Sequence, residues 1–250
     1  MLIYEYPFNE TVRSLLRLEY LFNRLDVYLD SDNPEHHLTA ISLIFDIGEV
    51  TSRADLKSNL LKELERQRIF LTSFRSEASI NSEALESTIS EIEKCLTTLN
   101  NLIGKPNTIM NESEWLSMIR TRLSVPGGTS PIDLPSFYSW QQRPAEERRA
   151  QLLTYTPAFA DWKSTTNLYL RLLRQSADFH DAASENGSFQ QMLAGKTYQL
   201  IRVKVSEDDI IPEISANKHM LWIRFLHNPG NTKPQAVTGN IAFSLALCNL

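Results

Sequence analysis

The sequence predicts an α+β protein, in which a mostly helical domain is inserted between an N-terminal strand and a C-terminal antiparallel β domain. Apolar residues recur at three- and four-residue spacing through most of the first part of the chain, which is the period of an amphipathic helix. Towards the C-terminus, short segments alternate apolar and polar residues, as strands with one buried face do. We therefore expect an α-helical domain at residues 8–186 and a β-strand domain at residues 187–250, joined by a strand at residues 2–6.

The composition is that of an ordinary globular protein. The chain has 250 residues, of which 42% are hydrophobic and 22% are charged, and its net charge is −5. This charge does not favour attraction of the whole molecule to nucleic acid or to an anionic membrane. Because the sequence shows neither a membrane-spanning apolar run nor a secretory signal, we expect a cytoplasmic protein. Its two cysteines, Cys95 and Cys248, suggest neither a disulfide framework nor a zinc site.

The first long helix is expected to start after Asn9, which can cap it, and to run to about Leu29. Apolar residues fall on one side of this helix, and Arg13, Arg17 and Arg24 fall together on another. Like charges four residues apart repel each other mildly. The arginine face is therefore either a solvated surface or a binding surface, and the residues alone leave both open.

A second helix is expected from about Glu35 to Phe45, and His36 and His37 lie in its first turn. Neighbouring side chains point about 100° apart on a helix, so one metal ion is poorly placed to bind both histidines. We expect both histidines to be exposed to solvent.

Two longer helices follow, at about residues 55–75 and 82–103, and a short link lets them fold back as an antiparallel hairpin. Their apolar residues follow the spacing of a coiled-coil seam. The seam positions are Leu60, Leu64, Gln67, Leu71 and Phe74 in the first helix and Leu85, Ile89, Ile92, Leu96, Leu99 and Ile103 in the second. The seam forms either the internal core of the hairpin or, from Leu85 to Ile103, a surface for a second copy of the chain.

A rigid corner is predicted at residues 120–135, which read RTRLSVPGGTSPIDLP. The proline at the start of Pro-Gly-Gly (126–128) stops a helix, and the glycines permit the positive φ angles of a tight turn. Asp133 is expected to cap the next helix, which begins near Pro135. Because the segment lacks the glycine spacing of phosphate-binding loops, a structural corner is favoured over a nucleotide site.

Shorter helices complete the helical domain. They are expected around Trp115, around Phe137 and Trp140, from Pro144, and from Pro157 to about Ala183. Asn186 and Gly187 are expected to end this domain. Strands are then expected at residues 189–193, 198–205, 221–226 and 241–248, with turn residues between them.

The sequence contains no recognisable catalytic constellation. The motifs HExxH, GxSxG and CxxC and the Walker loop are absent, and the five histidines do not have the spacing of metal ligands. We expect no enzyme activity, no cofactor and no bound metal. Arginines on helix faces beside aromatic residues instead suit the binding of a peptide with acidic and apolar residues. Nucleic acid would use similar groups, but the acidic total disfavours it.

Several segments together resemble the ZapD family of Z-ring-associated cell-division proteins. They are YEYPFNETVRSLLRLEYL, LLKELERQ, WLSMIRTRLSVPGG with IDLP, LRLLRQSA and PEISANKHMLWIRF, which occur in that family's order across nearly the whole chain. The resemblance implies a homodimer without enzyme activity that works at the midcell division site. The implied partner is FtsZ, the tubulin-like division GTPase. A dimer that binds two FtsZ C-terminal tails cross-links and bundles filaments through bivalency.

The resemblance also implies which residues bind the tail. Arg13 and Arg17 match the two arginines of the family's opening RxxLR pattern. Arg120 and Arg122 match its RxR before PGG, and Arg224 matches the arginine of its late IRF. We therefore expect a basic, arginine-lined cleft. Whether arginines from the helical and β domains share one cleft stays open at this point.

The sequence departs from the family pattern at three positions. Ser130 and Ile132 stand where cysteine and phenylalanine are usual, and Tyr138 stands where histidine is common. These changes leave all five arginines in place, but a polar contact assigned to that histidine has no counterpart here. The alternative function is binding of a small molecule or nucleotide at the Pro-Gly-Gly corner.

Overall fold

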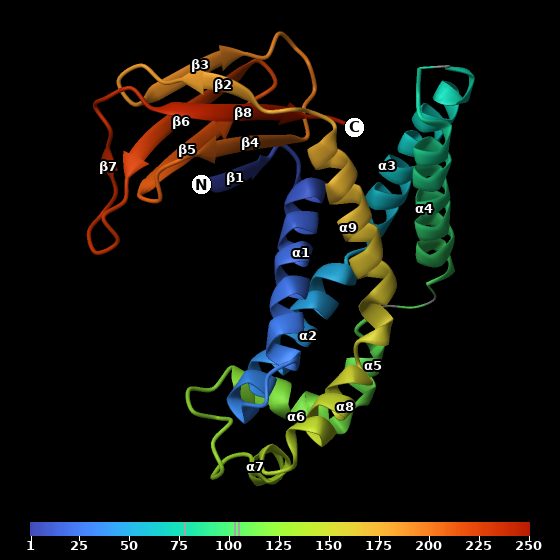
Figure 1. Ribbon diagram of the computed structural model, residues 1–250. Helices are drawn as coiled ribbons and strands as arrows, with labels where there is room; N and C mark the ends of the chain where they lie inside the picture. The colour runs from blue at the N-terminus through green and yellow to red at the C-terminus, as the bar shows by residue number, and fades with distance from the viewer. Residues whose placement is uncertain (78, 103, 105) are drawn as a thin grey trace. The chain divides into compact units, whose positions relative to one another are not determined.

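The computed structural model describes residues 1–77, 79–102, 104 and 106–250 (Figure 1). In this part of the chain, an N-terminal strand precedes a helical region and a C-terminal region of antiparallel strands. The α+β class predicted from the sequence is confirmed. Within the same residues, no helix is both long and apolar enough to cross a lipid bilayer.

The chain forms two compact units, which are called here the helical unit (Ser14–Leu168) and the β unit (Met1–Arg13 with Tyr169–Leu250). The domains expected from the sequence, 8–186 and 187–250, were divided where the helical pattern gives way to the strand pattern. The boundaries between the two compact units lie elsewhere, after Arg13 in the first long helix and after Leu168 in the last one. Two side chains of the C-terminal half of the last helix are hydrogen-bonded within the β unit, Tyr169 to Gln199 and Arg174 to Glu5 of the N-terminal strand.

The helices begin close to where caps and apolar periodicity place them. Helix α1 (Glu10–Leu29) is capped by Asn9, whose Oδ1 accepts a hydrogen bond of 2.8 Å from the N–H of Val12. Helix α2 (Pro34–Thr51) extends beyond its predicted end at Phe45. The remaining helices are α3 (Ala54–Thr72), α4 (Ser82–Asn101), α5 (Thr108–Glu112), α6 (Glu114–Leu123), α7 (Pro135–Gln141), α8 (Ala145–Leu153) and α9 (Ala160–Gln175), with short 3-10 helices at Ser73–Ser76 and Pro157–Phe159.

Helices α3 and α4 form the predicted antiparallel hairpin (Figure 1). Its seam is internal, because Leu60, Leu64, Ile92 and Leu99 are fully buried within this chain. The seam positions Leu85, Ile89, Ile92 and Leu99 are therefore core and not a surface for a second copy, whereas Leu96 is half-buried. A charged substitution at Ile92 would test folding and not dimerisation. Ile103, the last predicted seam position, lies outside the described residues.

The prediction that His37 is exposed is wrong, because helices α7 and α8 supply groups that surround it. Its Nδ1 accepts a hydrogen bond of 3.0 Å from Nε of Arg148, and its ring lies 6.2 Å from that of Trp140. Burial, and then the charge of Arg148, lower the pKa of His37 below its ordinary value. His37 is a neutral core residue, while His36 is exposed as predicted.

The β unit contains two antiparallel sheets. One has the strand order β1-β4-β8-β2, and the other has the order β3-β6-β5 with β7 paired to β6. The N-terminal strand joins the first sheet as predicted, in a register that runs from Leu2 opposite Val205 to Pro7 opposite Leu200. The strands are β1 (Leu2–Pro7), β2 (His180–Ala183), β3 (Ser188–Met192), β4 (Leu200–Val205), β5 (Ile210–Ala216), β6 (Met220–His227), β7 (Gln235–Ala236) and β8 (Ala242–Cys248).

The predicted end of the last helix near Ala183 is wrong. Helix α9 stops at Gln175, and residues 180–183 form β2. Asn186 and Gly187 have φ angles of 49° and 71° and make the tight turn between β2 and β3. Asn-Gly between two extended segments is a strong hairpin signal, so the sequence alone could have predicted this hairpin turn. At Gly187 a Cβ atom would come within 2.1 Å of the Val237 carbonyl oxygen, which leaves no room for any other residue.

Candidate arginine-lined binding site

The structure distributes the five candidate arginines between the two units. Arg17, Arg120 and Arg122 lie in the helical unit, whereas Arg13 and Arg224 lie in the β unit. The geometry of a binding site can therefore be followed for three of them within the helical unit. The basic, arginine-lined cleft expected from the sequence stays a prediction.

Arg17 lies in a groove between helices α1 and α2, which is called here the α1–α2 groove. The groove has a volume of about 430 Å³. Its lining residues are Arg17, Tyr20, Leu21, Asp46, Glu49, Val50 and Arg53. Two cations, two anions and an exposed tyrosine therefore share one surface, which is less basic than the sequence suggested. Arg53, Asp46 and Glu49 were missed because only the pairing of α1 with α2 brings them to Arg17.

Arg24 extends the α1–α2 groove with a cationic and aromatic surface along α1. Its guanidinium carbon lies 5.5 Å from the ring centroid of Tyr20 and 5.4 Å from that of Tyr28. A hydrogen bond with Tyr28 is the main cause of the raised pKa of Arg24. Guanidinium groups stacked on rings lose little freedom when they bind a carboxylate, so this side of the helix suits an acidic ligand with apolar neighbours.

Asp46 is the group in the α1–α2 groove that works against an acidic ligand. Partial burial and then the neighbouring charge of Glu49 raise the pKa of Asp46, while Arg24 opposes this shift. The carboxylate therefore sits where its negative charge is already disfavoured. A second carboxylate that bound Arg17 would add to that repulsion.

Arg120 lies against helix α2 at Phe45, the residue that precedes Asp46 in the sequence. Its guanidinium carbon lies 5.5 Å from the ring centroid of Phe45. Helix α6, which carries Arg120, starts after its N-cap residue Ser113, whose Oγ accepts a hydrogen bond of 3.3 Å from the N–H of Leu116. Trp115 on the same helix lies 5.1 Å from Trp140 of α7, measured between ring centroids. These contacts hold α6 so that Arg120 stays beside α2.

Arg122 lies at the predicted corner, and its partner there is Asp133, at 3.7 Å. The prediction that Asp133 caps α7 is wrong, since Leu134 is the N-cap residue and makes no side-chain cap bond. Gly127 has the expected positive φ of 70°. Gly128 is required for a different reason, because a Cβ atom there would lie 2.6 Å from the carbonyl oxygen of Arg122.

The backbone of the corner is hydrogen-bonded to itself. The N–H of Gly128 donates to Val125, and the N–H of Ser130 donates to Gly127, at 2.9 and 3.0 Å. A phosphate-binding loop needs such N–H groups to point at its ligand. These two are already used inside the corner, which favours the structural interpretation of Pro-Gly-Gly over a nucleotide site.

In the β unit, Arg13 and Arg224 both have acidic neighbours. Arg13 lies 3.3 Å from Glu10, one turn earlier in α1. Arg224 of β6 is paired with Glu213 of β5 on the outward face of the second sheet, where Trp222 is also exposed. Such exposed pairs are weak, so both arginines can exchange these partners for an external carboxylate at little cost.

A family model described as "ZapD: Cell division protein" matches residues 16–224. Proteins called "Cell division protein ZapD" are also similar to the chain over 100% of both lengths. Those of Cupriavidus pinatubonensis, Cupriavidus taiwanensis and Ralstonia pickettii are 47%, 45% and 45% identical to it over 251 residues. The chain belongs to the ZapD family. The resemblance inferred from its motifs is thereby confirmed.

The ZapD family model spans Arg17, Arg120, Arg122 and Arg224, and Arg13 lies within the full-length similarity to the ZapD relatives. Across the part of the chain that the structure describes, no group of three or more histidine, cysteine, aspartate or glutamate residues is arranged to hold a metal ion. In this ZapD-family chain, the α1–α2 groove contains charged groups that can form ion pairs and an exposed aromatic ring. Groups of these two kinds are typical of peptide-binding surfaces.

Proposed function

We propose that this chain is a non-enzymatic cell-division factor that binds the C-terminal tail of FtsZ through its arginines. As a homodimer, it cross-links and bundles FtsZ filaments and so promotes Z-ring assembly at midcell. The observation that carries this proposal is the full-length similarity to proteins named Cell division protein ZapD. The proposed tail-binding residues are Arg13, Arg17, Arg120, Arg122 and Arg224.

The α1–α2 groove is the best supported place for the tail. Arg17 and Arg53 can each hold a carboxylate with two parallel N–H bonds, while exposed Tyr20 offers an apolar surface in the same groove. Arg120, beside Phe45, adds a further cation at the border of α2. A peptide with alternating acidic and apolar side chains fits this distribution of groups.

In this proposal, bundling results from the presence of two tail-binding sites in one homodimer. A dimer presents two tail sites, and after one site has bound, the second meets other tails at a high local concentration. Two weak contacts then hold neighbouring filaments together more tightly than either contact alone. The chain therefore needs no chemical step to change filament organisation.

Replacing Arg17 with glutamate should weaken binding of a synthetic FtsZ tail peptide about ten- to a hundredfold. The substitution removes a charge-assisted contact of roughly 1.5–3 kcal/mol and adds a repulsive charge. Fluorescence anisotropy of a labelled peptide measures the affinity, and Arg143→Glu is the matched control because Arg143 is an exposed arginine of the same unit outside the α1–α2 groove. Equal affinities for the two variants would show that the site is misplaced.

Co-sedimentation with GTP-assembled FtsZ tests the partner itself. The chain should pellet with full-length filaments and bundle them, and it should stay in the supernatant with filaments that lack the C-terminal tail. Pelleting with both kinds of filament would move the contact away from the tail. Pelleting with neither would contradict the proposed function.

Replacing Asp46 with asparagine should strengthen binding of the same tail peptide about two- to fivefold. The change removes a negative charge close to Arg17 while it keeps the shape of the side chain, and exposed charge pairs are worth about 0.2–1 kcal/mol. Glu146→Gln, at an exposed position of α8, serves as the control for the change in net charge. Weaker binding by Asp46→Asn would mean that Asp46 is itself a ligand for the peptide.

A further inference from the structure

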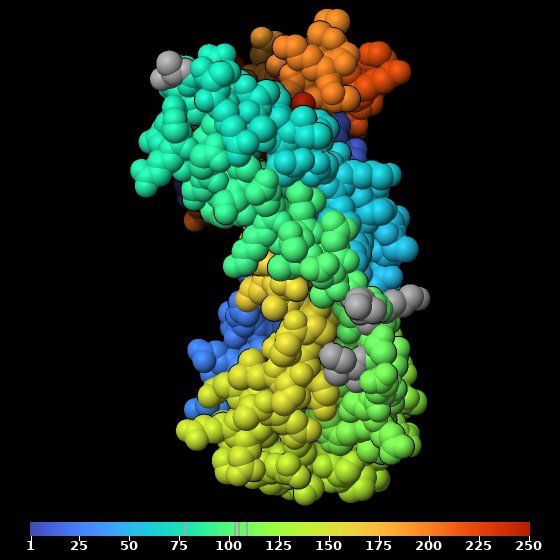
Figure 2. Space-filling view, turned by 90° about the vertical axis from the view of Figure 1, so that its right-hand side faces the viewer, coloured from blue at the N-terminus to red at the C-terminus, as the bar shows by residue number. Residues whose placement is uncertain are grey.

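The C-terminal half of α1 forms a further groove with α8 and the start of α9, which is called here the α1–α8 groove. The groove has two adjoining parts of about 220 and 680 Å³, and Asp26, Leu29 and Leu153 line both of them. In Figure 2 the blue surface of α1 lies beside the yellow surface of α8 and α9. The α1–α8 groove shares no lining residue with the α1–α2 groove, so it is a separate surface of the helical unit.

The smaller part of the α1–α8 groove is mostly apolar. Its apolar lining residues are Phe22, Leu25, Leu29, Leu153, Phe159 and Ala160. Leu153 is 47% exposed, and Val27 in the larger part is 69% exposed. An apolar cavity of about 150 Å³ is enough to hold a benzene molecule, so the smaller part can take an aromatic or a branched aliphatic side chain. Covering this apolar surface would be favourable, because it removes the surface from water.

Two cations at the border of the α1–α8 groove are already paired within the chain. Nζ of Lys163 donates hydrogen bonds of 2.7 and 2.6 Å to the two carboxylate oxygens of Asp26. Arg149 donates hydrogen bonds of 2.9–3.0 Å to Oδ1 of Asp32 and to two backbone carbonyl oxygens at the C-terminal end of α1. These bonds hold α8 and α9 beside α1, and they leave neither cation unpaired for an acidic ligand.

The carboxylate of Asp30 is the acidic group of this groove that has no partner. Among the residues that the structure describes, it accepts no hydrogen bond and forms no ion pair. Asp30 directly follows α1, whose last turn contains no basic residue, so the negative end of the helix dipole adds to its field. Together with Asp26 and Asp32, three carboxylates face the two cations, which gives −1. The groove therefore favours a cationic ligand and disfavours an anionic one, such as nucleic acid or a lipid headgroup.

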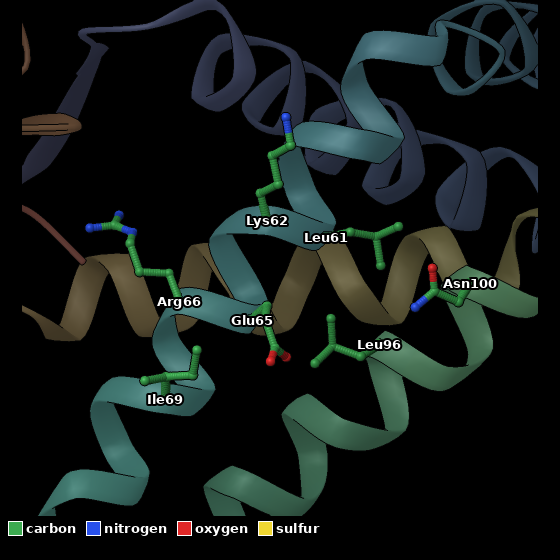
Figure 3. A pocket seen from close by; sticks show the side chains of 7 residues that line it. All are labelled: Leu61, Lys62, Glu65, Arg66, Ile69, Leu96 and Asn100. Carbon is green, nitrogen blue, oxygen red and sulfur yellow. The ribbon is translucent and has the colours of Figure 1, made fainter.

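The groove on the hairpin of α3 and α4 lacks this combination (Figure 3). Figure 3 shows its apolar side chains, Leu61, Ile69 and Leu96. Glu65 lies in the middle of them and accepts two hydrogen bonds from Arg68, and across the hairpin Arg75 pairs with Glu86. A charged group in the middle of an apolar surface hinders the burial of an apolar side chain. The α1–α8 groove, with its charges at the border, is the better anchor site.

We propose that the α1–α8 groove binds a segment of a protein partner in which a large apolar side chain stands next to a lysine or an arginine. The apolar side chain fills the smaller part of the groove, and the cation pairs with Asp30. This partner has a charge opposite to that of the acidic tail proposed for the α1–α2 groove. One copy of the chain can therefore connect two different partners. The inference goes beyond the proposed function and does not depend on it.

The test begins with a phage-displayed library of random dodecapeptides, selected on the full-length wild-type chain. Each enriched peptide is then measured against Ala160→Phe, in which a phenyl ring attached at the border of the smaller part occupies it. We expect a class of peptides that combine tryptophan, phenylalanine or leucine with an adjacent lysine or arginine. These peptides should bind Ala160→Phe about tenfold more weakly, or less, because the ring takes the place of their anchor.

The control for Ala160→Phe is Ala54→Phe. Ala54 is exposed and is the first residue of α3, as Ala160 is of α9, but it lines neither part of the groove. This variant should bind the selected peptides as the wild type does. Circular dichroism checks that both variants keep their helix content, which is expected for substitutions at exposed positions.

Replacement of Asp30 tests the cationic half of the motif without filling the groove. Fluorescence anisotropy of a labelled synthetic copy of a selected peptide should show that Asp30→Asn weakens binding about two- to fivefold, as expected for the loss of an exposed ion pair. Asp178→Asn, at an exposed aspartate of the β unit, makes the same change in net charge and should leave the affinity unchanged.

Several outcomes would overturn the inference. One is that every enriched peptide binds Ala160→Phe as tightly as the wild type, or that the library yields no enriched peptide. Another is that the peptides sensitive to Ala160→Phe lack a cation, or bind Asp30→Asn and Asp178→Asn equally well. A changed sedimentation coefficient of Ala160→Phe would also overturn it, because the occupant would then be a second copy of the chain.

Binding of the FtsZ tail peptide separates this inference from the proposed function. Ala160→Phe should bind the tail peptide as the wild type does, because Ala160 lies outside the α1–α2 groove. If the wild type binds the selected peptides through the α1–α8 groove but binds no tail peptide, the inference holds and the proposed function fails.

Discussion

Replacement of Arg148 with methionine is expected to lower the free energy of unfolding of the helical unit by about 3–5 kcal/mol. The Arg148 side chain is buried, and besides His37 it donates hydrogen bonds to the carbonyl oxygens of Asp32, Gln141 and Arg143. Methionine fills a similar volume but leaves these acceptors unpaired away from water, which costs about 1–3 kcal/mol for each group that finds no water. Urea unfolding followed by far-ultraviolet circular dichroism measures the loss.

Two further variants make the Arg148 experiment specific. Arg148→Lys keeps the charge but cannot reach several acceptors at once with a single ammonium group, so it should recover little of the lost stability. Arg143→Met, at an exposed site, should change the unfolding free energy by less than about 0.5 kcal/mol. A loss of unfolding free energy below about 1 kcal/mol for Arg148→Met would show that the hydrogen bonds of Arg148 to Asp32, Gln141 and Arg143 contribute little to stability.

Replacement of Glu5 with glutamine is expected to lower the free energy of unfolding of the β unit by about 2–3 kcal/mol. Glu5 of β1 accepts two hydrogen bonds of 2.8 Å from Arg174 of α9 and one of 3.0 Å from Arg202 of β4. These side chains are only 16–25% exposed, so the change removes the negative charge that two half-buried guanidinium groups share. The estimate lies below the cost for a fully buried pair because water still reaches the three groups.

Hydrogen exchange of the β1 and β4 amides measures the effect of Glu5→Gln where the network lies. The matched control is Glu213→Gln, which also breaks a cross-strand pair between a carboxylate and a guanidinium group, with Arg224. Because that pair is exposed, its loss should cost less than about 1 kcal/mol. Equal losses of protection in the two variants would contradict the argument that burial makes the Glu5 network important.

Local signals in the sequence were sufficient for most of the helices. Asn9 caps the helix that it was expected to cap, and most seam positions of the hairpin are buried, although Leu71, Phe74 and Leu96 are only half-buried. These features depend on contacts between residues close in sequence, whose geometry is set by the helix itself. The pairing of β1 with the C-terminal sheet was also predicted, because an alternating segment must find a partner.

Several side-chain contacts between distant segments were not predicted. His37 looked exposed because the residue that bonds to it, Arg148, lies 111 positions away. Strand β5 was overlooked because Pro212 interrupts its pattern, although proline is tolerated on an edge strand. At the candidate site, family motifs pointed to Arg17, but only the packing of α2 brings Asp46 into the same groove. The family motifs thus indicated the arginines of the site, but not the neighbouring carboxylate of Asp46, which opposes the binding of an acidic ligand.

The pairing of β1 with β4 has a consequence for synthesis of the chain. Strand β1 is made almost 200 residues before its partner in the sheet, Leu200–Val205. At about 5–20 residues per second, β1 waits on the order of 10–40 s without a partner. The helical unit is complete in sequence during that time, whereas Leu2, Ile3 and Tyr4 remain an unpaired apolar edge. Nascent chains should therefore depend on chaperones that cover β1 until β4 has been made.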